Sequence, residues 1–234
     1  MTPLYPTSEA AHRHDSFHPM TSPPNGHCAP LLRRYSLGVA LAGLAWLGGC
    51  ASPAEVPSPV MLVLRTQPPV GAAPLLQASP QATWRAPWQL MQPVRVPDYL
   101  DHDALLLPQG ANGVQASQSY RWAELLSQSV PRVLAQDLLT TAGEGSVWTG
   151  TVPRGMVVRG QLRVELLALD VDAQRRSVTL KARWTTAESD AAMKPQAHAV
   201  SLTEPSAGPD PDSLVSAHRL ALLRLAQAIA RTLP

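Results

Sequence analysis

The groups of this sequence that could do chemistry are a few histidines, carboxylates and thiols. Asp101, His102 and Asp103 form the densest set, and carboxylate oxygens together with an imidazole nitrogen can bind a divalent metal. Adjacent residues point in different directions on a strand or helix, so three in a row do not close around one ion. We therefore expect an exposed loop at these residues, and we expect His198 and His218 at the surface of a strand and a helix.

Sequence signatures of the common enzyme classes are absent. The 234 residues contain no G-x-S-x-G nucleophile motif, no G-x-x-x-x-G-K-[ST] phosphate loop and no paired cysteines at a zinc-binding spacing. The net charge is +2, and no stripe of Lys and Arg could neutralise a run of phosphates. The sequence therefore predicts a protein that is not an enzyme, needs no cofactor or metal, and does not bind nucleic acid.

The N-terminal region has the pattern of a signal peptide. Arg33 and Arg34 precede an apolar run from Leu37 to Leu47, and small residues lead to Cys50. A positive end, a short apolar middle and small residues before a cleavage point are typical of export signals, and the run is too short to be a permanent membrane span. Cleavage before Cys50 removes Cys28, so the mature chain keeps a single thiol that cannot form an internal disulfide.

The residues Leu47-Gly48-Gly49-Cys50 resemble the lipobox of bacterial lipoproteins. The resemblance implies that the Cys50 thiol receives a diacylglycerol, that the chain is cut before it, and that the new amine is acylated. Several acyl chains, at about 0.8 kcal/mol per buried CH₂, would make the attachment permanent. Ala51 in place of an aspartate resembles the pattern passed on to the outer membrane, so we expect a lipid anchor on its periplasmic face. A cysteine that follows a signal peptide by coincidence is the alternative.

Composition and proline placement predict one folded domain on a short tether. We assign residues 1–49 to an N-terminal extension and signal peptide, residues 50–59 to a Pro-rich tether, and residues 60–234 to a single domain. Pro53, Pro57 and Pro59 favour an extended tether of roughly 3 Å per residue, which reaches about 30 Å at most. The domain should therefore stay close to its membrane.

Hydrophobic patterns predict a largely antiparallel sheet. The apolar run Val60–Leu64 suggests a central strand covered on both faces, and the clearest alternation gives a hairpin of Leu162–Ala168 and Val178–Trp184 with a turn at Asp170–Gln174. Shorter segments with strand character are Val94–Val96, Leu105–Leu107 and an edge strand at His198–Leu202.

Two helices complete the predicted fold. The first should begin near Ser119 and end at Gly143, with Pro131 kinking it or splitting it so that Ser129 caps a second piece. The second should be capped by Asp212 or Ser213. Its apolar stripe includes Val215, Leu222, Ala226, Ile229 and Leu233. Together these elements predict an α+β sandwich in which two helices pack on one face of an antiparallel sheet.

The order of features across the mature chain resembles the PqiC family, the auxiliary lipoproteins of MCE-type ABC transport systems. The segments that carry the resemblance are Val96-Pro97-Asp98-Tyr99-Leu100-Asp101, Arg121-Trp122-Ala123-Glu124-Leu125-Leu126, Val130-Pro131-Arg132-Val133-Leu134, Asp137-Leu138, Arg183-Trp184 and Leu225-Ala226-Gln227-Ala228-Ile229-Ala230. The positions that we single out as core or docking residues are Pro97, Tyr99, Leu100, Arg121, Trp122, Glu124 and Leu125. The chain departs from the family pattern at His102, where arginine is frequent, and at Leu125-Leu126, where a Pro-Leu pair is common.

The resemblance implies a subunit without chemistry of its own in a system that moves phospholipid-like molecules between the inner and outer membranes. Its partner would be an MCE-domain tunnel protein with its ABC transporter, and a collar around such a tunnel would require a homo-oligomeric ring. A structural or assembly lipoprotein for an outer-membrane or polysaccharide-export complex is the second hypothesis, and a periplasmic enzyme is the third. The transported lipid cannot be identified from these residues.

Overall fold

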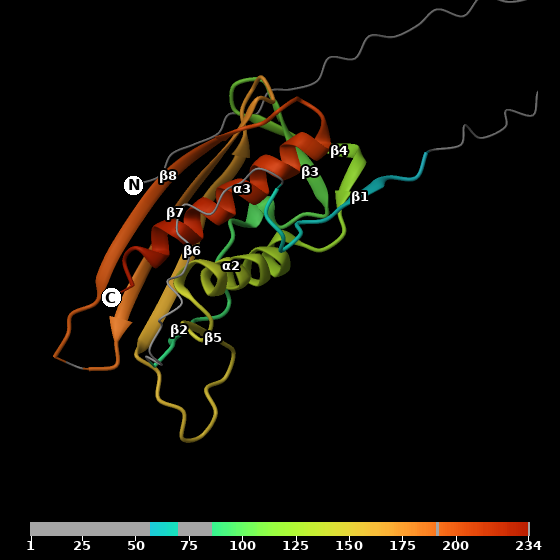
Figure 1. Ribbon diagram of the computed structural model, residues 1–234. Coiled ribbons are helices and arrows are strands. Elements are labelled where there is room, and N and C mark those ends of the chain that lie inside the picture. Colours follow the sequence, from blue (N-terminus) through green and yellow to red (C-terminus); the bar gives the residue numbers. More distant parts are fainter. Residues whose placement is uncertain (1–56, 70–85, 191, 234) are drawn as a thin grey trace, which may run out of the picture. The chain divides into compact units, whose positions relative to one another are not determined.

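The computed structural model describes residues 57–69, 86–190 and 192–233. In these ranges two α-helices, one short 3-10 helix and eight strands form an α+β fold (Figure 1). The strands belong to a five-stranded and a three-stranded sheet. The predicted fold class, a sheet with two packed helices, is confirmed.

The five-stranded sheet has the order β5-β2-β6-β7-β8. Its antiparallel part consists of β6 (Gly160–Val171), β7 (Ser177–Glu188) and β8 (Gln196–Pro205), so the predicted hairpin and the predicted edge strand are both present. The short strands β2 (Trp88–Leu90) and β5 (Val147–Thr149) pair in parallel, β2 with both β6 and β5. The sheet is therefore mixed, a feature that alternation along the chain could not reveal.

A β-bulge changes which side chains of β6 face the core. Leu162, Val164 and Leu166 are buried as predicted, but the register shifts between Leu166 and Ala168, and Leu169 takes the inward position instead of Ala168. An extra residue in one strand of a pair reverses the faces of all later side chains. As a result β6 runs on to Val171, and the turn lies two residues later than predicted, between β6 and β7.

The three-stranded sheet has the order β1-β4-β3. Here β1 (Val60–Leu62) is an edge strand, parallel to the end of β4 (Gly113–Trp122), which pairs antiparallel with β3 (Ala104–Gln109). The prediction of a central strand covered on both faces is wrong, because Val60 is 55% exposed while Leu62 and Leu64 are buried. The predicted strand at Val94–Val96 is reduced to one parallel bridge between Arg95 and Glu165.

The first long helix, α2 (Leu126–Ala142), begins later than predicted. Ser119 and Trp122 belong to β4, although Trp122 lies three and four residues before Leu125 and Leu126, which is a helical spacing. Gly143 follows the last helical residue as expected, but Pro131 does not split the helix, and Ser129 is a buried helical residue instead of a cap. Only the bond to the Ser127 carbonyl is missing, near the start of the helix, where packing of the apolar face compensates for it.

The second long helix, α3 (Pro211–Ala230), is capped by Asp210 and not by Asp212 or Ser213. The Asp210 side chain accepts a hydrogen bond from the Ser213 N–H at 2.9 Å, and Pro211 occupies the first helical position, where its missing N–H costs nothing. Leu222, Ala226 and Ile229 are buried as predicted, whereas Val215 and Leu233 are only partly buried.

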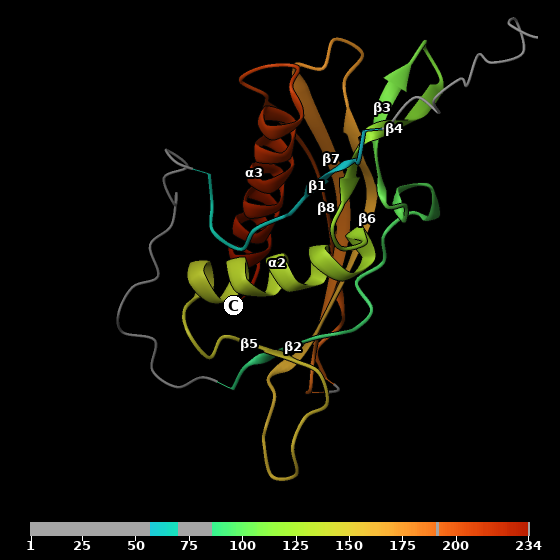
Figure 2. The same cartoon turned by 90° about the vertical axis from the view of Figure 1, so that its right-hand side faces the viewer.

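Both helices cover the same face of the large sheet, as a side view shows (Figure 2). One continuous cluster of buried apolar residues joins the two helices to both sheets. Residues 57–69, the N-terminal arm, run from β1 across the helices, and the arm adds Leu62 and Leu64 to the core. The arm therefore belongs to the folded domain.

Candidate functional site

The two main motif segments of the sequence come together in the structure. The first forms the 3-10 helix η1 (Asp98–Leu100), which Pro97 precedes, and the second forms the end of β4 and the start of α2. The Asp101 carboxylate accepts a hydrogen bond from the Ser127 N–H at 3.4 Å. The Asp101 carboxylate thereby satisfies an N–H in the first turn of α2 that has no partner within the helix, because the N-cap residue, Leu125, has no polar side chain.

An ion pair with a bifurcated hydrogen bond ties the same two segments together. Arg121 Nη1 donates to both carboxylate oxygens of Asp103, at 2.9 and 2.8 Å, and the Trp122 N–H donates to the Asp103 carbonyl oxygen at 2.5 Å. Asp101, His102 and Asp103 are exposed in a bend, as predicted. The two aspartates therefore hold the junction of β4 and α2.

Tyr99, Leu100 and Trp122 have separate roles in this region. The Tyr99 hydroxyl donates to Asp170 Oδ1 on β6 at 2.7 Å, and burial together with this bond raises the pKa of the phenol. Leu100 and Trp122 are buried in the core. Trp122 also lies edge-on against His218, at 5.7 Å between ring centroids.

His218 corrects one prediction, because it is 3% exposed in α3 and not a surface residue. Its Nδ1 lies 2.7 Å from the Leu214 carbonyl oxygen, and burial lowers its pKa. His198 on β8 is partly buried and stacks on Trp184 at 5.4 Å between centroids. Neither imidazole is placed against a nucleophile, so the two rings fill space beside tryptophans.

Glu124 connects the start of α2 to the N-terminal arm. Its carboxylate accepts a bond from Arg132 Nη2 at 2.5 Å, and the same nitrogen donates to the Leu64 carbonyl oxygen at 3.2 Å. Leu125 is partly buried at the first turn of the helix. These two motif positions support the arm and the helix end.

A buried ion pair that the sequence did not reveal holds the next residues of the arm. Arg219 of α3 contacts both carboxylate oxygens of Asp137 of α2, at 2.5 and 2.7 Å, and the two side chains are 3% and 2% exposed. Arg219 also donates to the carbonyl oxygens of Arg65 at 2.7 Å and Thr66 at 2.5 Å. One guanidinium thus joins both helices and the arm, and all its contacts are to residues far away in the sequence.

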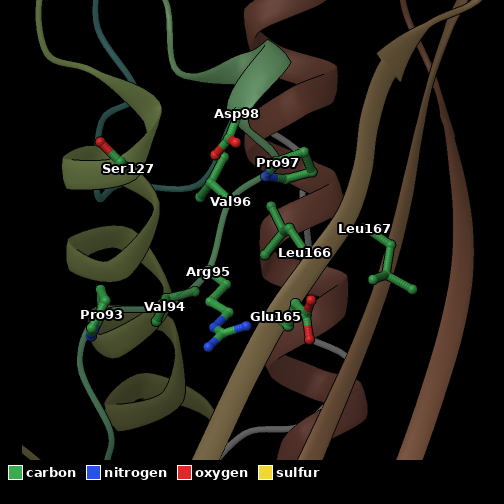
Figure 3. A pocket seen from close by; sticks show the side chains of 10 residues that line it. All are labelled: Pro93, Val94, Arg95, Val96, Pro97, Asp98, Ser127, Glu165, Leu166 and Leu167. Carbon is green, nitrogen blue, oxygen red and sulfur yellow. The ribbon is translucent and has the colours of Figure 1, made fainter.

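A hollow of about 590 Å³ lies beside the motif region (Figure 3). Its walls come from the segment before η1, the first turn of α2 and the middle of β6. Arg95 and Glu165 stand across the bridge that joins the segment to β6, and Leu167 lies at the rim with 44% of its surface exposed. The hollow combines apolar walls with charges of both signs, a composition that suits contact with a polypeptide.

The described ranges contain neither a cluster of metal ligands nor a helix that could span a membrane. No three His, Cys, Asp or Glu residues gather there in a way that could hold a metal ion. Among the same residues, no helix has both the length and the apolar character needed to cross a membrane. Cys50, the predicted lipidation site, lies outside the residues that the structure describes.

The class of the protein at the level of architecture is an α+β fold, and the comparisons give its family. Residues 72–230 match the model of the ABC-type transport auxiliary lipoprotein component. The chain therefore belongs to this family, whose members are lipoproteins that assist ABC-type transport. A search of curated proteins returned no match.

Solved structures with the same fold support this assignment at the level of architecture. A crystal structure of an uncharacterized protein aligns with a TM-score of 0.58 at 16% identity, covering 76% of this chain and 100% of that one. A protein of Xanthomonas campestris from the DUF330 family aligns with a TM-score of 0.55 at 11% identity, covering 73% and 92%. At these identities the likeness shows the fold alone.

Proposed function

We propose that this protein is a lipid-anchored, non-enzymatic docking subunit of an MCE-type ABC transport system that moves phospholipid-like molecules between the two membranes. Acyl chains on Cys50 would hold it on the periplasmic face of the outer membrane. An MCE tunnel protein rooted in the inner membrane would be its partner.

The family match over residues 72–230 is the observation that carries this proposal. The lipobox-like residues Leu47-Gly48-Gly49-Cys50 support the anchor, and the Pro-rich tether of about 30 Å supports a position close to one membrane. The hollow supports a binding role. His198 and His218 pack beside tryptophans and not against a nucleophile, which agrees with such a role. Pro97, Tyr99, Arg121 and Glu124 would act by shaping the region around the hollow.

A Cys50→Ser variant tests the anchor. We expect the wild-type protein in the outer-membrane fraction, with an N-terminal mass increased by acyl chains, and the variant in the soluble periplasmic fraction. An unmodified Cys50 in the natural protein would contradict the anchor.

Deletion of the gene and affinity purification test the partner. We expect the deletion to sensitise cells to detergent, and we expect the tagged, membrane-extracted protein to bring down an MCE protein. Recovery of outer-membrane assembly or polysaccharide-export proteins in its place would favour the second hypothesis and contradict this one.

A further inference from the structure

The face of the large sheet opposite the helices is mostly uncovered in the described part of the chain, apart from η1, whose Tyr99 reaches Asp170 there. Figure 2 shows both helices on the other side of β6, β7 and β8. The side chains on this open face alternate with the buried ones, and they include Arg163, Glu165 and Leu167 on β6, Lys181 and Arg183 on β7, and Ala197 and Ala199 on β8. Since the core lies entirely on the helix side, these residues are not needed to fill it.

The open face carries unpaired positive charge. Arg183 is neutralised by Glu165, with Nε donating to Oε2 at 2.7 Å. Three basic residues are exposed and form no ion pair with another described residue. They are Arg163 and Lys181 on the strands and Arg95 at the rim of the hollow. Asp98 is the opposing carboxylate at the rim. Asp170 of β6, which Tyr99 contacts, is a third carboxylate on this face, so the four basic residues exceed the acidic ones by one charge.

Two hollows and one exposed apolar side chain make the open face uneven. A second hollow, of about 320 Å³, lies over Ala197 and Ala199 and meets the first hollow at Glu165. Leu167, at the bulge in β6, points outward at the junction of sheet and segment and is 44% exposed. Bulges often re-aim a side chain beside a functional surface. A partner could place side chains in both hollows and contact Leu167 between them.

We propose that the open face docks a carboxylate-rich surface of the protein partner. This inference rests on the proposed function and specifies the chemistry of the contact. Guanidinium forks pair with carboxylates in two-point contacts, and arginine is enriched where proteins meet. A surface made for anionic lipid would gather Lys and Arg in one basic cluster, whereas here the basic residues stand beside the carboxylates Glu165, Asp98 and Asp170.

A charge-reversal pair tests the proposal. The variant Arg163→Glu with Lys181→Glu changes two exposed residues of the open face, and the control Arg154→Glu with Lys194→Glu makes the same charge change in exposed loops. The probe is the purified periplasmic domain of the MCE protein from the same bacterium. Binding to lipidated, full-length mature protein in phosphatidylcholine nanodiscs is measured at low and physiological salt.

We expect the open-face variant to bind at least about tenfold more weakly than wild type at low salt and to lose most of the salt dependence, while the control binds like wild type. Circular dichroism and thermal unfolding establish that both variants fold, and Lys181→Glu alone serves if the double variant does not. Equal binding of wild type and the open-face variant overturns the inference and leaves the proposed function standing. Absence of wild-type binding overturns the proposed function itself.

Vesicle flotation separates a membrane target from a protein target. The Cys50→Ser form, which lacks acyl chains, is mixed with vesicles containing phosphatidylglycerol. We expect no flotation at physiological salt. Flotation that the open-face variant loses, together with unchanged binding to the MCE domain, would assign the face to anionic lipid and overturn the proposal.

Discussion

At the residue scale, the pair Arg219 and Asp137 is the most consequential polar contact described. Burial raises the pKa of Asp137 to about 6, and the hydrogen bonds and positive charge of Arg219 oppose this rise only in part. The carboxylate is therefore still ionised at neutral pH and balances the guanidinium. Two charges removed from water in this way are costly unless each satisfies the other.

Removing one partner of this pair should destabilise the domain far more than replacing both. Asp137→Asn or Arg219→Met alone leaves a buried group unsatisfied, and we expect each to lower the free energy of unfolding by about 3–5 kcal/mol. The double variant Asp137→Leu with Arg219→Met should be closer to wild type than either single variant. Urea unfolding at pH 7 measures all three. A double variant whose loss equals the sum of the single losses would contradict the pairing.

The sequence indicated the motif residues but not the chemistry that holds them. Asp137 and Arg219 are 82 positions apart, so neither periodicity nor a short motif could join them. His218 reads as a polar residue on a helix, and only the packing of Trp122 explains why it is buried. Arg121 and Glu124 were singled out from the sequence, and their partners, Asp103 and Arg132, come from the fold.

At the element scale, the two candidates for the α3 cap give a direct test of structure against sequence. Asp210 accepts from the Ser213 N–H, whereas Asp212 lies exposed in the first turn. The pKa of Asp210 is lowered by hydrogen bonds with Ser213, first its side chain and then its N–H. We expect Asp210→Ala to lower the melting temperature by about 2–4 °C at pH 7. Asp212→Ala, the control, should lower it less.

The pH dependence of this difference follows from the lowered pKa of Asp210. An acid whose folded pKa is depressed contributes stability that is present above its unfolded pKa and lost as the pH falls through the folded value. The difference in melting temperature between Asp210→Ala and wild type should therefore become smaller in strong acid. A larger loss in Asp212→Ala than in Asp210→Ala would restore the cap predicted from the sequence.

Elements whose apolar residues repeat with one clear period were predictable from the sequence. Elements whose position depends on pairing with strands far along the chain were not. The hairpin of β6 and β7 alternates over many residues and was found with its buried face, up to the bulge after Leu166. The start of α2 was misplaced, because Trp122 satisfies a helical spacing while pairing with Leu62 in a strand. The position of β2 depends on parallel partners more than 50 residues along the chain, which local patterns do not encode.

At the scale of the whole molecule, two buried groups make opposite contributions to stability as pH falls. The folded pKa of His218 is lowered by burial, so below the ordinary histidine value of 6.5 the unfolded chain binds the proton more readily and the fold loses stability. The folded pKa of Asp137 is raised from 3.8 to about 6, so its contribution is present below 3.8 and lost as pH rises through about 6. The two contributions oppose each other between about pH 4 and 6.

Replacing His218 should expose the contribution of Asp137. We expect wild-type free energy of unfolding in urea to change little from pH 6.5 to 5, because the two groups offset each other. In His218→Leu it should rise as the pH falls over this range, by up to about 1 kcal/mol per pH unit, since each pKa unit corresponds to 1.36 kcal/mol. His102→Leu, in an exposed bend, is the control and should keep the wild-type profile. The lost contact with Trp122 shifts the variant at every pH, so the slope is the measured quantity, and parallel profiles would show that the two buried groups do not oppose each other.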